Sequence, residues 1–457
     1  MEYVADSARR FQSLLGRPWC AFLDSGRIDR GGCRAGRYDI LAAEPYMTLT
    51  TRGAVTDIRA AGAVRRSERD PLELLKECLG EPADVDADHG LPFRGGAIGY
   101  FAYDLGRRFE RLPSIAAADI DVPDMAVGLY DWAVIVDHEQ RRSWLVGEGR
   151  DRRTFADWDR LLDAVQPTDA LSRAPFEVVS AVRSSFDRAG YAAAFDRVKS
   201  HIRAGDCYQV NLTQRFDAGV RGDPWYAYMK LRWLNPAPFA AYLSLPDCSV
   251  LSSSPERFLR VRDGHVETKP IKGTRRRSSD PAEDAALAEE LRSSAKDRAE
   301  NVMIVDLLRN DLGKHCAAGS IRATKLFDVE SFANVHHLVS TVEGRLAAGR
   351  HALDLFRGAF PGGSITGAPK LRAMEIIEAL EPQRRGVYCG AIGYVGFDGN
   401  MDTNIAIRTL VQHGERIYAW AGGGVVADSE VESEYQESLT KAEAMLAVLG
   451  DRAREAG

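Results

Sequence analysis

The N-terminal third of the chain alternates apolar and polar positions in short runs that end at Gly or Asp. Such alternation is typical of half-buried β-strands, because successive side chains of a strand point to opposite faces. The runs are WCAFLDSG (19–26), MTLTTRGAVTDIRA (47–60) and WAVIVDHEQRRSWLV (132–146), the last of which predicts a hairpin that turns at 137–142. DPLELLKECLG (70–80) instead has helical spacing, with Asp70 as the N-terminal cap and Gly80 as the stop.

The periodicity weakens between residues 151 and 186, where AVQPTDALSRAPFEVVS is typical of a connection. We therefore divide the chain into an N-terminal region (1–150), a connection (151–186) and a C-terminal region (187–450). In the C-terminal region, apolar spacing predicts helices over 187–206, 297–314, 373–382 and 430–450. It predicts strands over 207–216, 239–245, 249–261, 265–273, 390–399 and 415–426.

The sequence contains one pair of similar ten-residue segments, which we call the echo segments. GGAIGYFAYD (95–104) resembles CGAIGYVGFD (389–398). Two independent strand pairs of the same kind would explain the match, and so would an old duplication of part of the chain. A single short echo favours the first explanation.

Composition excludes several classes of protein. Apolar residues make up 45% of the 457 residues and charged residues 28%, the balance of a globular enzyme. A net charge of −6 gives no general attraction to nucleic acid or anionic membranes, and the basic run 275–277 is too short to change this. Seven widely spaced cysteines without a CxxC motif indicate neither a disulfide framework nor a zinc site. The sequence has no signal-peptide core and no membrane-length apolar run, so we expect a cytoplasmic protein.

Two predicted helices open with carboxylates three residues apart, Asp297 with Glu300 and Glu434 with Glu437. Residues at this spacing share a helix face, and two such pairs could meet around Mg²⁺, which prefers carboxylate oxygens and water. The sequence alone favours the alternative that they are helix-capping carboxylates stabilised by the helix dipole. The apolar residues behind Glu300 indicate that most of its helix is buried: Val302, Ile304, Val305 and Leu308.

Three segments are rich in glycine: FPGGSITGAPK (360–370), GAIGYVGFDGN (390–400) and AGGGVVADS (421–429). The first runs into a predicted helix, and free N–H groups at a helix start bind carboxylates or phosphates. Neither GxxxxGK[ST] nor GxGxxG occurs in the required context, which disfavours a nucleotide site. Arg408 could supply the forked donor that a carboxylate prefers. The alternative for each segment is a turn or a bulge.

Candidate acids, bases and nucleophiles are few. His336 and His337 are adjacent, and the one that faces inward is more often a satisfied core residue than a catalyst. Glu256 follows a proline at a strand end, either as a surface carboxylate or as a buried acid with a raised pKa. No GxSxG motif occurs, and nothing around Cys207 marks a catalytic thiol. Lys272, in a predicted turn after Pro270, remains open as a solvated cation, an anion clamp or a nucleophile.

Long segments of the sequence resemble the chorismate-utilising enzymes: anthranilate synthase large subunits, isochorismate and salicylate synthases, and aminodeoxychorismate synthase component I. The matching segments are FLDSG, AAEPYMTL, GDCYQVNLTQRF, SPERF, KPIKGTRRR, SAKDRAENVMIVDLLRNDLG, VHHLVSTVEG, AFPGGSITGAPK, MDTNIAIRTL, AGGGVVADSE and EYQESLTKA. The resemblance implies an α+β, two-lobed fold of large, mainly antiparallel sheets with helices outside and the active site between the lobes. It also implies that region 1–150 is like the N-terminal part of anthranilate synthase component I and that region 187–450 binds chorismate.

Lys272 distinguishes the members of this family. Anthranilate and isochorismate synthases usually read Pro-Ile-Ala-Gly-Thr here, whereas PIKGT resembles aminodeoxychorismate synthase component I. In that group the lysine is taken to attack C2 of chorismate with loss of the C4 hydroxyl, after which ammonia attacks C4 and expels the lysine. The amine must be neutral, so we expect a partly desolvated site that lowers its pKa. Gln209 stands where water-adding relatives carry a lysine base, which disfavours isochorismate chemistry.

The resemblance assigns the other roles by position. Glu256 resembles the general acid that protonates the departing C4 hydroxyl. Glu300 and Glu437 resemble Mg²⁺ ligands, with Asp297 and Glu434 in support, and the metal would hold the ring carboxylate. The expected substrate-binding residues are Gln209, Thr274, His337, Tyr388, Arg408, Gly422, Gly423, Gly424 and Lys441. His337 resembles a histidine implicated in the elimination chemistry of anthranilate synthase, whereas this chain is expected to keep the pyruvyl group.

We therefore predict an enzyme that aminates chorismate to 4-amino-4-deoxychorismate, on the way to 4-aminobenzoate and folate. The sequence shows no glutaminase half, so ammonia is expected from a separate glutaminase subunit or from free ammonium. Phe22 to Gly26 (FLDSG) is a short match to the segment through which anthranilate-type relatives bind tryptophan, which makes tryptophan a candidate ligand. One alternative, an anthranilate synthase large subunit, is disfavoured by Lys272. The other, a non-catalytic regulator that binds chorismate or tryptophan, would not need both a nucleophile and a metal site.

Overall fold

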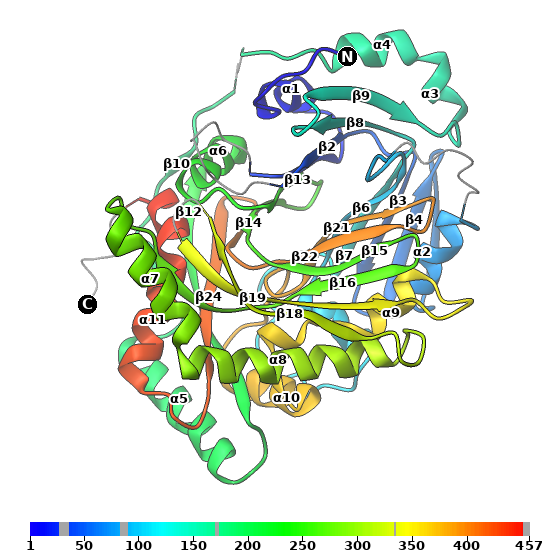
Figure 1. The fold of residues 1–457 in the computed structure, drawn as a ribbon. Coiled ribbons are helices and arrows are strands. Elements are labelled where there is room, and N and C mark those ends of the chain that lie inside the picture. The colour runs from blue at the N-terminus through cyan, green and yellow to red at the C-terminus, as the bar shows by residue number, and fades with distance from the viewer. Residues whose placement is uncertain (27–35, 83–89, 170–172, 333–334, 451–457) are drawn as a thin grey trace.

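The computed structural model describes residues 1–26, 36–82, 90–169, 173–332 and 335–450. The chain folds into two large sheets built from antiparallel strand pairs, with helices on the outside (Figure 1). This confirms the predicted α+β class and the mainly antiparallel sheets. Strands from before residue 150 and after residue 187 occur in both sheets. The division of the sequence at 151–186 stays a prediction.

The first sheet joins the two ends of the sequence. Its spatial order is β10 (Glu177–Val178), β12 (Gln209–Arg221), β24 (Arg416–Val425), β23 (Thr409–His413), β14 (Ser249–Ser254), β13 (Phe239–Ser244), β1 (Cys20–Asp24), β2 (Tyr38–Ala42), β8 (Trp132–Asp137) and β9 (Arg142–Gly147). Two short strands, β11 (Arg183–Ser184) and β20 (Gly367–Ala368), also pair with β12. The predicted hairpin over 132–146 is confirmed as β8 and β9.

The second sheet has a similar size. Its order is β17 (Ile271–Arg276), β19 (Val335–Arg345), β16 (His265–Lys269), β15 (Arg257–Arg262), β22 (Met401–Ile405), β21 (Ala391–Gly396), β6 (Gly96–Phe101), β7 (Met125–Tyr130), β3 (Met47–Arg52), β4 (Val55–Ala60) and β5 (Ala63–Ser67), with β18 (Arg322–Ser331) paired to β19. The alternation of side chains builds two cores. Ala21 packs into a core shared by both sheets, whereas its neighbour Phe22 packs with helices on the opposite face of the first sheet.

The helices are α1 (Ala8–Phe11), α2 (Pro71–Leu79), α3 (Arg152–Ala156), α4 (Trp158–Ala164), α5 (Arg188–Arg203), α6 (Pro224–Leu234), α7 (Pro281–Ser293), α8 (Ala295–Gly313), α9 (Ala352–Ala359), α10 (Lys370–Leu380) and α11 (Val431–Val448). Short 3₁₀ turns lie at η1 (Gln12–Leu14), η2 (Tyr103–Arg108) and η3 (Gly363–Ile365). The predicted limits of α2 are confirmed. The Asp70 carboxylate accepts from two N–H groups of its first turn, and Gly80 ends it with φ of 75°.

Two strand predictions were wrong in a way that matters for function. The segment 249–261 is not one strand, because the chain leaves the first sheet after Ser254 and enters the second at Arg257. The segment 265–273 breaks at Pro270, which has no N–H to donate to a ladder. Lys272 therefore lies in strand β17 and not in a turn.

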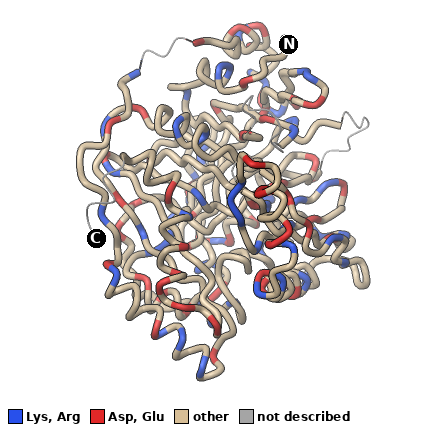
Figure 2. The backbone as a smooth tube through the Cα atoms, turned by 60° about the vertical axis from the view of Figure 1, so that its left-hand side comes forward, with Lys and Arg blue, Asp and Glu red and all other residues tan. Residues whose placement is uncertain are grey.

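The region after β17 also differs from the prediction. Helix α7 was not predicted, and Val302 of α8 is 44% exposed although Ile304, Val305 and Leu308 are buried. The acidic side chains of α7 neutralise the basic run 275–277 through the ion pairs Arg275–Glu290, Arg276–Glu283 and Arg277–Asp284. Elsewhere, basic and acidic residues are mixed along the chain (Figure 2).

The two echo segments pair with each other in the second sheet. Strands β6 and β21 are antiparallel neighbours, and Gly99 lies directly opposite Gly393. Both glycines face the same restriction, because a Cβ would lie 2.1 Å from Ala126 O at Gly99 and 2.1 Å from Asp402 O at Gly393. The two similar segments thus lie side by side, and Gly99 and Gly393 each meet the backbone of the next strand outward.

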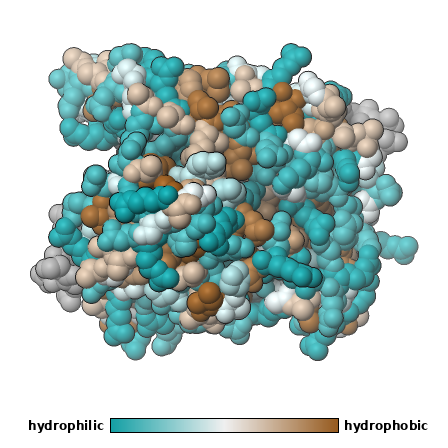
Figure 3. All heavy atoms as spheres, turned by 90° about the horizontal axis from the view of Figure 1, so that it is seen from below, coloured by the Kyte–Doolittle hydropathy of each residue, from teal (hydrophilic) through white to brown (hydrophobic). Residues whose placement is uncertain are grey.

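The surface shows few large apolar areas in the view from below, where hydrophilic side chains surround small separate apolar groups (Figure 3). In the described part of the chain, no helix is both long and apolar enough to cross a membrane. The described cysteines are free thiols, most of them buried, and Cys33 lies outside the described residues.

Candidate active site

Two adjacent links among those by which the chain crosses between the sheets each carry a predicted site residue. Glu256 lies between β14 and β15, and Arg408 ends the link from β22 to β23. The links are hydrogen-bonded, since Ile405 N donates to Glu256 O at 3.0 Å and Ser253 N donates to Arg408 O at 3.0 Å. The backbone of Arg408 is in the left-handed region, with φ of 52°. These links bring a carboxylic acid and a guanidinium to one junction.

Lys272 and Glu256 lie close enough to affect each other's protonation. Glu256 is 5% exposed, and burial raises its pKa to about 7, although the Ser364 hydroxyl, Lys272 and the Ile271 N–H favour its charged form. Burial lowers the pKa of Lys272, against the opposing attraction of Glu300. The expected neutral lysine and protonated acid are therefore both favoured by the site.

An irregularity in strand β17 orients Lys272 toward the candidate site. The pairing with β19 is irregular between Ile271 and Thr274, as in a β-bulge. Between them, Gly273 has φ of 81°, and a Cβ there would lie 2.9 Å from a carboxylate oxygen of Asp297. A side chain at position 273 would therefore be strained and would push against the start of α8.

Thr274 and His337 face each other across β17 and β19 and are joined at 2.9 Å between Oγ1 and Nδ1. Burial and then Arg408 lower the pKa of His337 to about 3, so this ring is neutral at physiological pH. Its neighbour His336 is also buried, but it contacts Ser331 at 2.8 Å and Asp284 of α7 at 3.1 Å. His337 is therefore the member of the pair that belongs to the site.

The glycine-rich end of β24 lies beside β12, under the start of α11. A Cβ at Gly423 would lie 2.7 Å from Glu434 Oε2, and one at Gly424 would lie 2.6 Å from Gln209 Nε2. Lys441 Nζ donates to Gly422 O at 3.0 Å. The glycines are required here because neighbouring side chains occupy the space over the strand.

The two predicted carboxylate pairs lie at the starts of α8 and α11. Glu434 is 4% exposed. Ser429 donates to its Oε1 at 2.7 Å, whereas its buried Oε2 has no hydrogen-bond partner in the described chain. Glu437 is 48% exposed and pairs with Lys441 at 2.6 Å. Asp297 pairs with Arg275 at 3.1 Å.

Burial raises the pKa of Glu300. The positive charges of Lys272 and Lys296 lower this pKa, whereas the negative charge of Glu437 raises it further. The two helix starts are thus within electrostatic range of each other. Within the described residues, however, no three acidic, His or Cys side chains gather closely enough to hold a metal. The unpartnered Glu434 oxygen and the all-carboxylate donor set suit Mg²⁺ chemically. Mg²⁺ binding by these four residues stays a prediction.

Arg408 and Tyr388 form the predicted carboxylate-binding side. Burial lowers the pKa of Arg408, and Tyr388 acts in the opposite direction. Tyr388 stacks on Trp420 with ring centroids 5.9 Å apart and an angle of 8°. Among the described residues, the Arg408 guanidinium makes no hydrogen bond or ion pair, which suits a group that receives a carboxylate ligand.

Several site residues were missed by sequence reasoning. Asn211, Ser364 and Arg385 connect β12 to the glycine-rich loop, and Lys296 faces the carboxylates. Ser364 stands inside the glycine-rich segment 360–370, which was a candidate for anion binding, but its partners could not be read from the sequence. Arg385 is buried despite lying in the polar stretch EPQRRG, and no local pattern indicates that burial.

The family model described as "chorismate binding enzyme" matches residues 33–447. The chain belongs to the chorismate-binding enzyme family. Aminodeoxychorismate synthase component 1 of Klebsiella aerogenes is 49% identical, over 95% of this chain and 95% of that protein. The protein of the same name from Escherichia coli K12 is 48% identical, over 95% and 94%.

Solved structures agree with the membership in this family. Anthranilate synthase component I from Streptococcus pneumoniae TIGR4 is 33% identical, with a TM-score of 0.80 over 92% of this chain and 94% of that one. The resemblance to aminodeoxychorismate synthase component I and the fold that it implied are confirmed. The roles of the individual residues stay predictions, since the comparisons name no residue.

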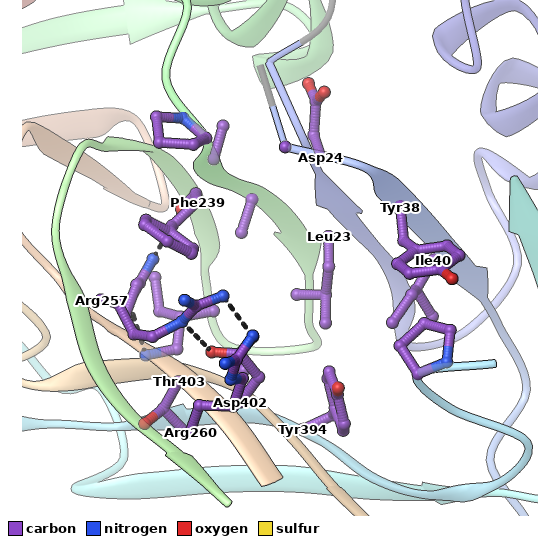
Figure 4. Close-up of a pocket in the computed structure, with 18 of the residues that line it drawn as sticks. Leu23, Asp24, Tyr38, Ile40, Phe239, Arg257, Arg260, Tyr394, Asp402 and Thr403 are labelled. Atoms are coloured by element: carbon purple, nitrogen blue, oxygen red, sulfur yellow. Dashed lines mark hydrogen bonds and ion pairs between the residues drawn. The ribbon is translucent and has the colours of Figure 1, made fainter. Parts of the chain in front are cut away.

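A cavity of about 310 Å³ is lined by strands of both sheets and by none of the predicted catalytic or metal-binding residues (Figure 4). Leu23 and Asp24 of β1 line it, so the cavity adjoins the predicted tryptophan segment. Tyr38, Phe239 and Tyr394 add aromatic walls. Near its floor Arg257 pairs with Asp402 at 3.0 Å. Tryptophan binding at this cavity stays a prediction.

Proposed function

We propose that this chain aminates chorismate with ammonia and releases 4-amino-4-deoxychorismate, the precursor of 4-aminobenzoate in folate synthesis. The observation that carries the proposal is the placement of Lys272 beside Glu256 and Glu300 with a lowered pKa. Relatives named aminodeoxychorismate synthase component 1, at 48–49% identity, support the same reaction. The overall chemistry is an amino-group transfer to C4 of the ring, with the enolpyruvyl ether retained.

In the first step, the neutral Lys272 amine attacks C2 of chorismate. The new C2–N bond forms as both ring double bonds shift, from C1=C2 to C1=C6 and from C5=C6 to C4=C5, and the C4–O bond breaks. Glu256 gives its proton to the departing hydroxyl, which leaves as water. The pKa of about 7 suits Glu256 to this task, because a group with a pKa near the working pH can both hold and release a proton.

In the second step, ammonia attacks C4, both double bonds shift back to C5=C6 and C1=C2, and the C2–N bond breaks. Lys272 leaves as the amine and is ready for another cycle. The Glu256 carboxylate left by the first step can accept the proton that the new C4 amine loses. Gln209 lies at the site, and its amide side chain is not a base that could deprotonate water. This is in keeping with ammonia and not water as the nucleophile. We expect a separate glutaminase subunit to supply the ammonia.

The remaining groups would hold the substrate. Arg408, Tyr388 and the backbone of Gly422 to Gly424 would bind carboxylates, and Thr274 would orient the neutral His337 in the pocket wall. Glu300 and Glu437, helped by Asp297 and Glu434, would hold Mg²⁺. The ion would supply positive charge against the ring carboxylate. Since His337 is neutral, it can serve as a hydrogen-bonding wall without a change of protonation.

The test is a product assay with purified chain, chorismate, Mg²⁺ and an ammonium salt, read by mass spectrometry. The expected product contains nitrogen and keeps the enolpyruvyl group. Anthranilate, which lacks that group, would instead support the anthranilate synthase alternative. Lys272→Ala run in parallel should give no aminated product. Chorismate that binds without any turnover, in the presence of ammonium, would favour the regulatory alternative.

We also propose that the 310 Å³ cavity is where tryptophan would bind, because the FLDSG segment lies at its edge and its walls are aromatic. Isothermal titration with tryptophan should give a saturable signal that Tyr394→Ala weakens. Phenylalanine serves as the ligand control. Equal binding by wild type and Tyr394→Ala would place the ligand elsewhere.

A further inference from the structure

The side chain of Lys199 joins helix α5 to the turn that leads from β24 into α11. Its Nζ donates to the main-chain oxygen of Ser429 at 2.9 Å, to that of Val426 at 3.4 Å, and also to that of Ala427. Helix α5 packs beside α11 and β24, so the lysine reaches the turn from a neighbouring element (Figure 1). An ammonium group has three N–H donors, and three carbonyl oxygens meet them here.

The turn 426–429, which we call the carbonyl turn, is closed by a hydrogen bond from Ser429 N to Val426 O at 3.1 Å. The three oxygens that contact Lys199 come from this one short segment and surround a single position. Their partial negative charges repel one another unless a cation lies between them, and groups of backbone carbonyls are a common way to bind K⁺. The Lys199 ammonium stands at that position and supplies the charge.

The carbonyl turn also holds a carboxylate of the candidate metal site. Val426 N donates to Ser429 Oγ at 3.0 Å, and Ser429 Oγ donates to Glu434 Oε1 at 2.7 Å. Ser429 is 3% exposed and Glu434 is 4% exposed. Because Glu434 Oε2 has no hydrogen-bond partner in the described chain, the bond from Ser429 orients the carboxylate and leaves Oε2 for a ligand.

We propose that the carbonyl turn is a monovalent-cation site that the Lys199 ammonium occupies in place of a free ion, and that Lys199 is thereby a positioning residue for Glu434. Lys199 acts through Ser429 and takes no part in the bond changes of the reaction. The role toward Glu434 rests on the proposed function, which takes this carboxylate as a Mg²⁺ ligand. The cation site itself does not.

A lysine that serves as a bound cation differs from one that only fills space. If the charge between the carbonyls is what holds the turn, a free ion of similar size can replace it once the side chain is shortened. K⁺ is close in size to an ammonium group and binds backbone carbonyls, whereas tetramethylammonium is too large to lie between them. A space-filling lysine gives no reason for the shortened variant to distinguish these two ions.

The first measurement is the thermal midpoint of wild type, Lys199→Ala and Lys199→Met in potassium chloride and in tetramethylammonium chloride at equal ionic strength. In tetramethylammonium chloride, Lys199→Ala should unfold about 2–4 °C below wild type. Potassium should recover at least half of this difference, since an ion that binds the folded state stabilises it. Lys199→Met keeps the length of the side chain without its charge and leaves no room for an ion, so its midpoint should stay low in both salts. A Lys199→Ala midpoint that responds to potassium no more than that of wild type would overturn the cation site.

The second measurement is Mg²⁺ binding by isothermal titration without chorismate. Groups that orient a metal ligand typically change metal affinity by about 10-fold to 100-fold. The Kd for Mg²⁺ should therefore rise by about tenfold in Lys199→Ala in tetramethylammonium chloride and return toward the wild-type value in potassium chloride. Lys199→Met should bind Mg²⁺ weakly in both salts. Equal Mg²⁺ affinity of all three proteins would overturn the positioning of Glu434.

Arg197 provides the matched control, since it is an exposed cation on the same helix. Arg197→Ala should bind Mg²⁺ like wild type and show no added response to potassium. The same potassium response in Arg197→Ala would mean that loss of any positive charge from α5 produces it, and it would remove the support for Lys199.

These measurements distinguish failure of the proposal from failure of the proposed function. Anthranilate as the product, together with the potassium response of Lys199→Ala, would defeat the proposed amination and keep the role of Lys199. Wild type that binds no Mg²⁺ would defeat the metal assignment and the positioning of Glu434 together, and the potassium response would still decide the cation site. Amination without any potassium response would defeat the role of Lys199 alone.

Discussion

The main-chain carbonyl of Arg408 accepts a hydrogen bond from the N–H of Ser253 at 3.0 Å, and this bond ties together two of the links by which the chain crosses between the sheets, β14 to β15 and β22 to β23. Next to it, the Ser254 hydroxyl donates to Ile405 O at 2.6 Å. The acid of one link and the guanidinium of the other are therefore set by the same pair of crossings. Changes in either link should disturb substrate binding and acid catalysis together.

Lys272→Ala should reduce kcat for amination by more than about 1000-fold, because loss of a covalent nucleophile removes the main route and not one contact. The measurement is formation of the aminated product with ammonium as nitrogen donor. Lys269→Ala is the matched control, since Lys269 lies at the end of β16, which precedes β17 in the sequence, and pairs with Glu330 at 2.6 Å. Full activity of Lys272→Ala would exclude the covalent route.

The pH dependence of kcat/KM should follow the protonation of the Glu256 carboxyl. Its folded-state pKa is about 7, and it acts in the protonated form, so kcat/KM should decrease as the pH rises through about 7. Glu256→Gln should abolish this decrease of kcat/KM with rising pH and lower kcat by about 100-fold or more. If kcat/KM of Glu256→Gln still decreased as the pH rises through about 7, the decrease would belong to the titration of another group.

Glu256 should also make stability depend on pH. Its pKa is raised on folding from 4.5 to about 7, so the folded state binds the proton more tightly than the unfolded state. The resulting stabilisation is fully present below the unfolded pKa and is lost as the pH rises through about 7. Urea unfolding at pH 5 and pH 9 should show wild type losing up to about 3 kcal/mol more than Glu256→Gln.

The sequence predicted the elements whose limits have local causes. Asp70 and Gly80 bound α2 because a cap and a left-handed stop are local signals. Lys272 was misplaced in a turn because the pairing of β17 with β19 joins segments that are far apart in sequence. The crossing at Glu256 was missed for the same reason, as SVLSSSPERFLRV reads as one strand until the sheets are known.

The residues of the candidate site also divide into those that stand in motifs and those whose position depends on tertiary contacts. The carboxylates, Lys272 and the glycines stand in motifs, so a family resemblance could place them. Arg385 stands in no motif, and its role depends on tertiary contacts with Ile365 and Asn211. Charge neutralisation of Arg275–Arg277 by α7 was equally hidden, since the partners lie on a helix that weak apolar spacing did not predict.

Gly423→Ala should damage the site without unfolding the protein. The added Cβ would lie 2.7 Å from Glu434 Oε2, so the carboxylate or the strand must move. We expect kcat/KM to fall by at least about tenfold, with a loss of stability of about 1–3 kcal/mol. The control is Gly313→Ala near the end of α8, where the nearest neighbour is 3.9 Å away. Equal effects of both substitutions would contradict the crowding at Gly423.

Glu434→Gln should weaken Mg²⁺ binding, because it replaces a buried carboxylate oxygen that has no hydrogen-bond partner in the described chain. Adding Mg²⁺ should raise the thermal midpoint of wild type, since a ligand of the folded state stabilises it by mass action. We expect most of this increase to be lost in Glu434→Gln. Glu430→Gln, an exposed carboxylate at the start of the same helix, should keep the wild-type response. No increase in wild type, or an equal increase in both variants, would exclude Glu434 from the metal site.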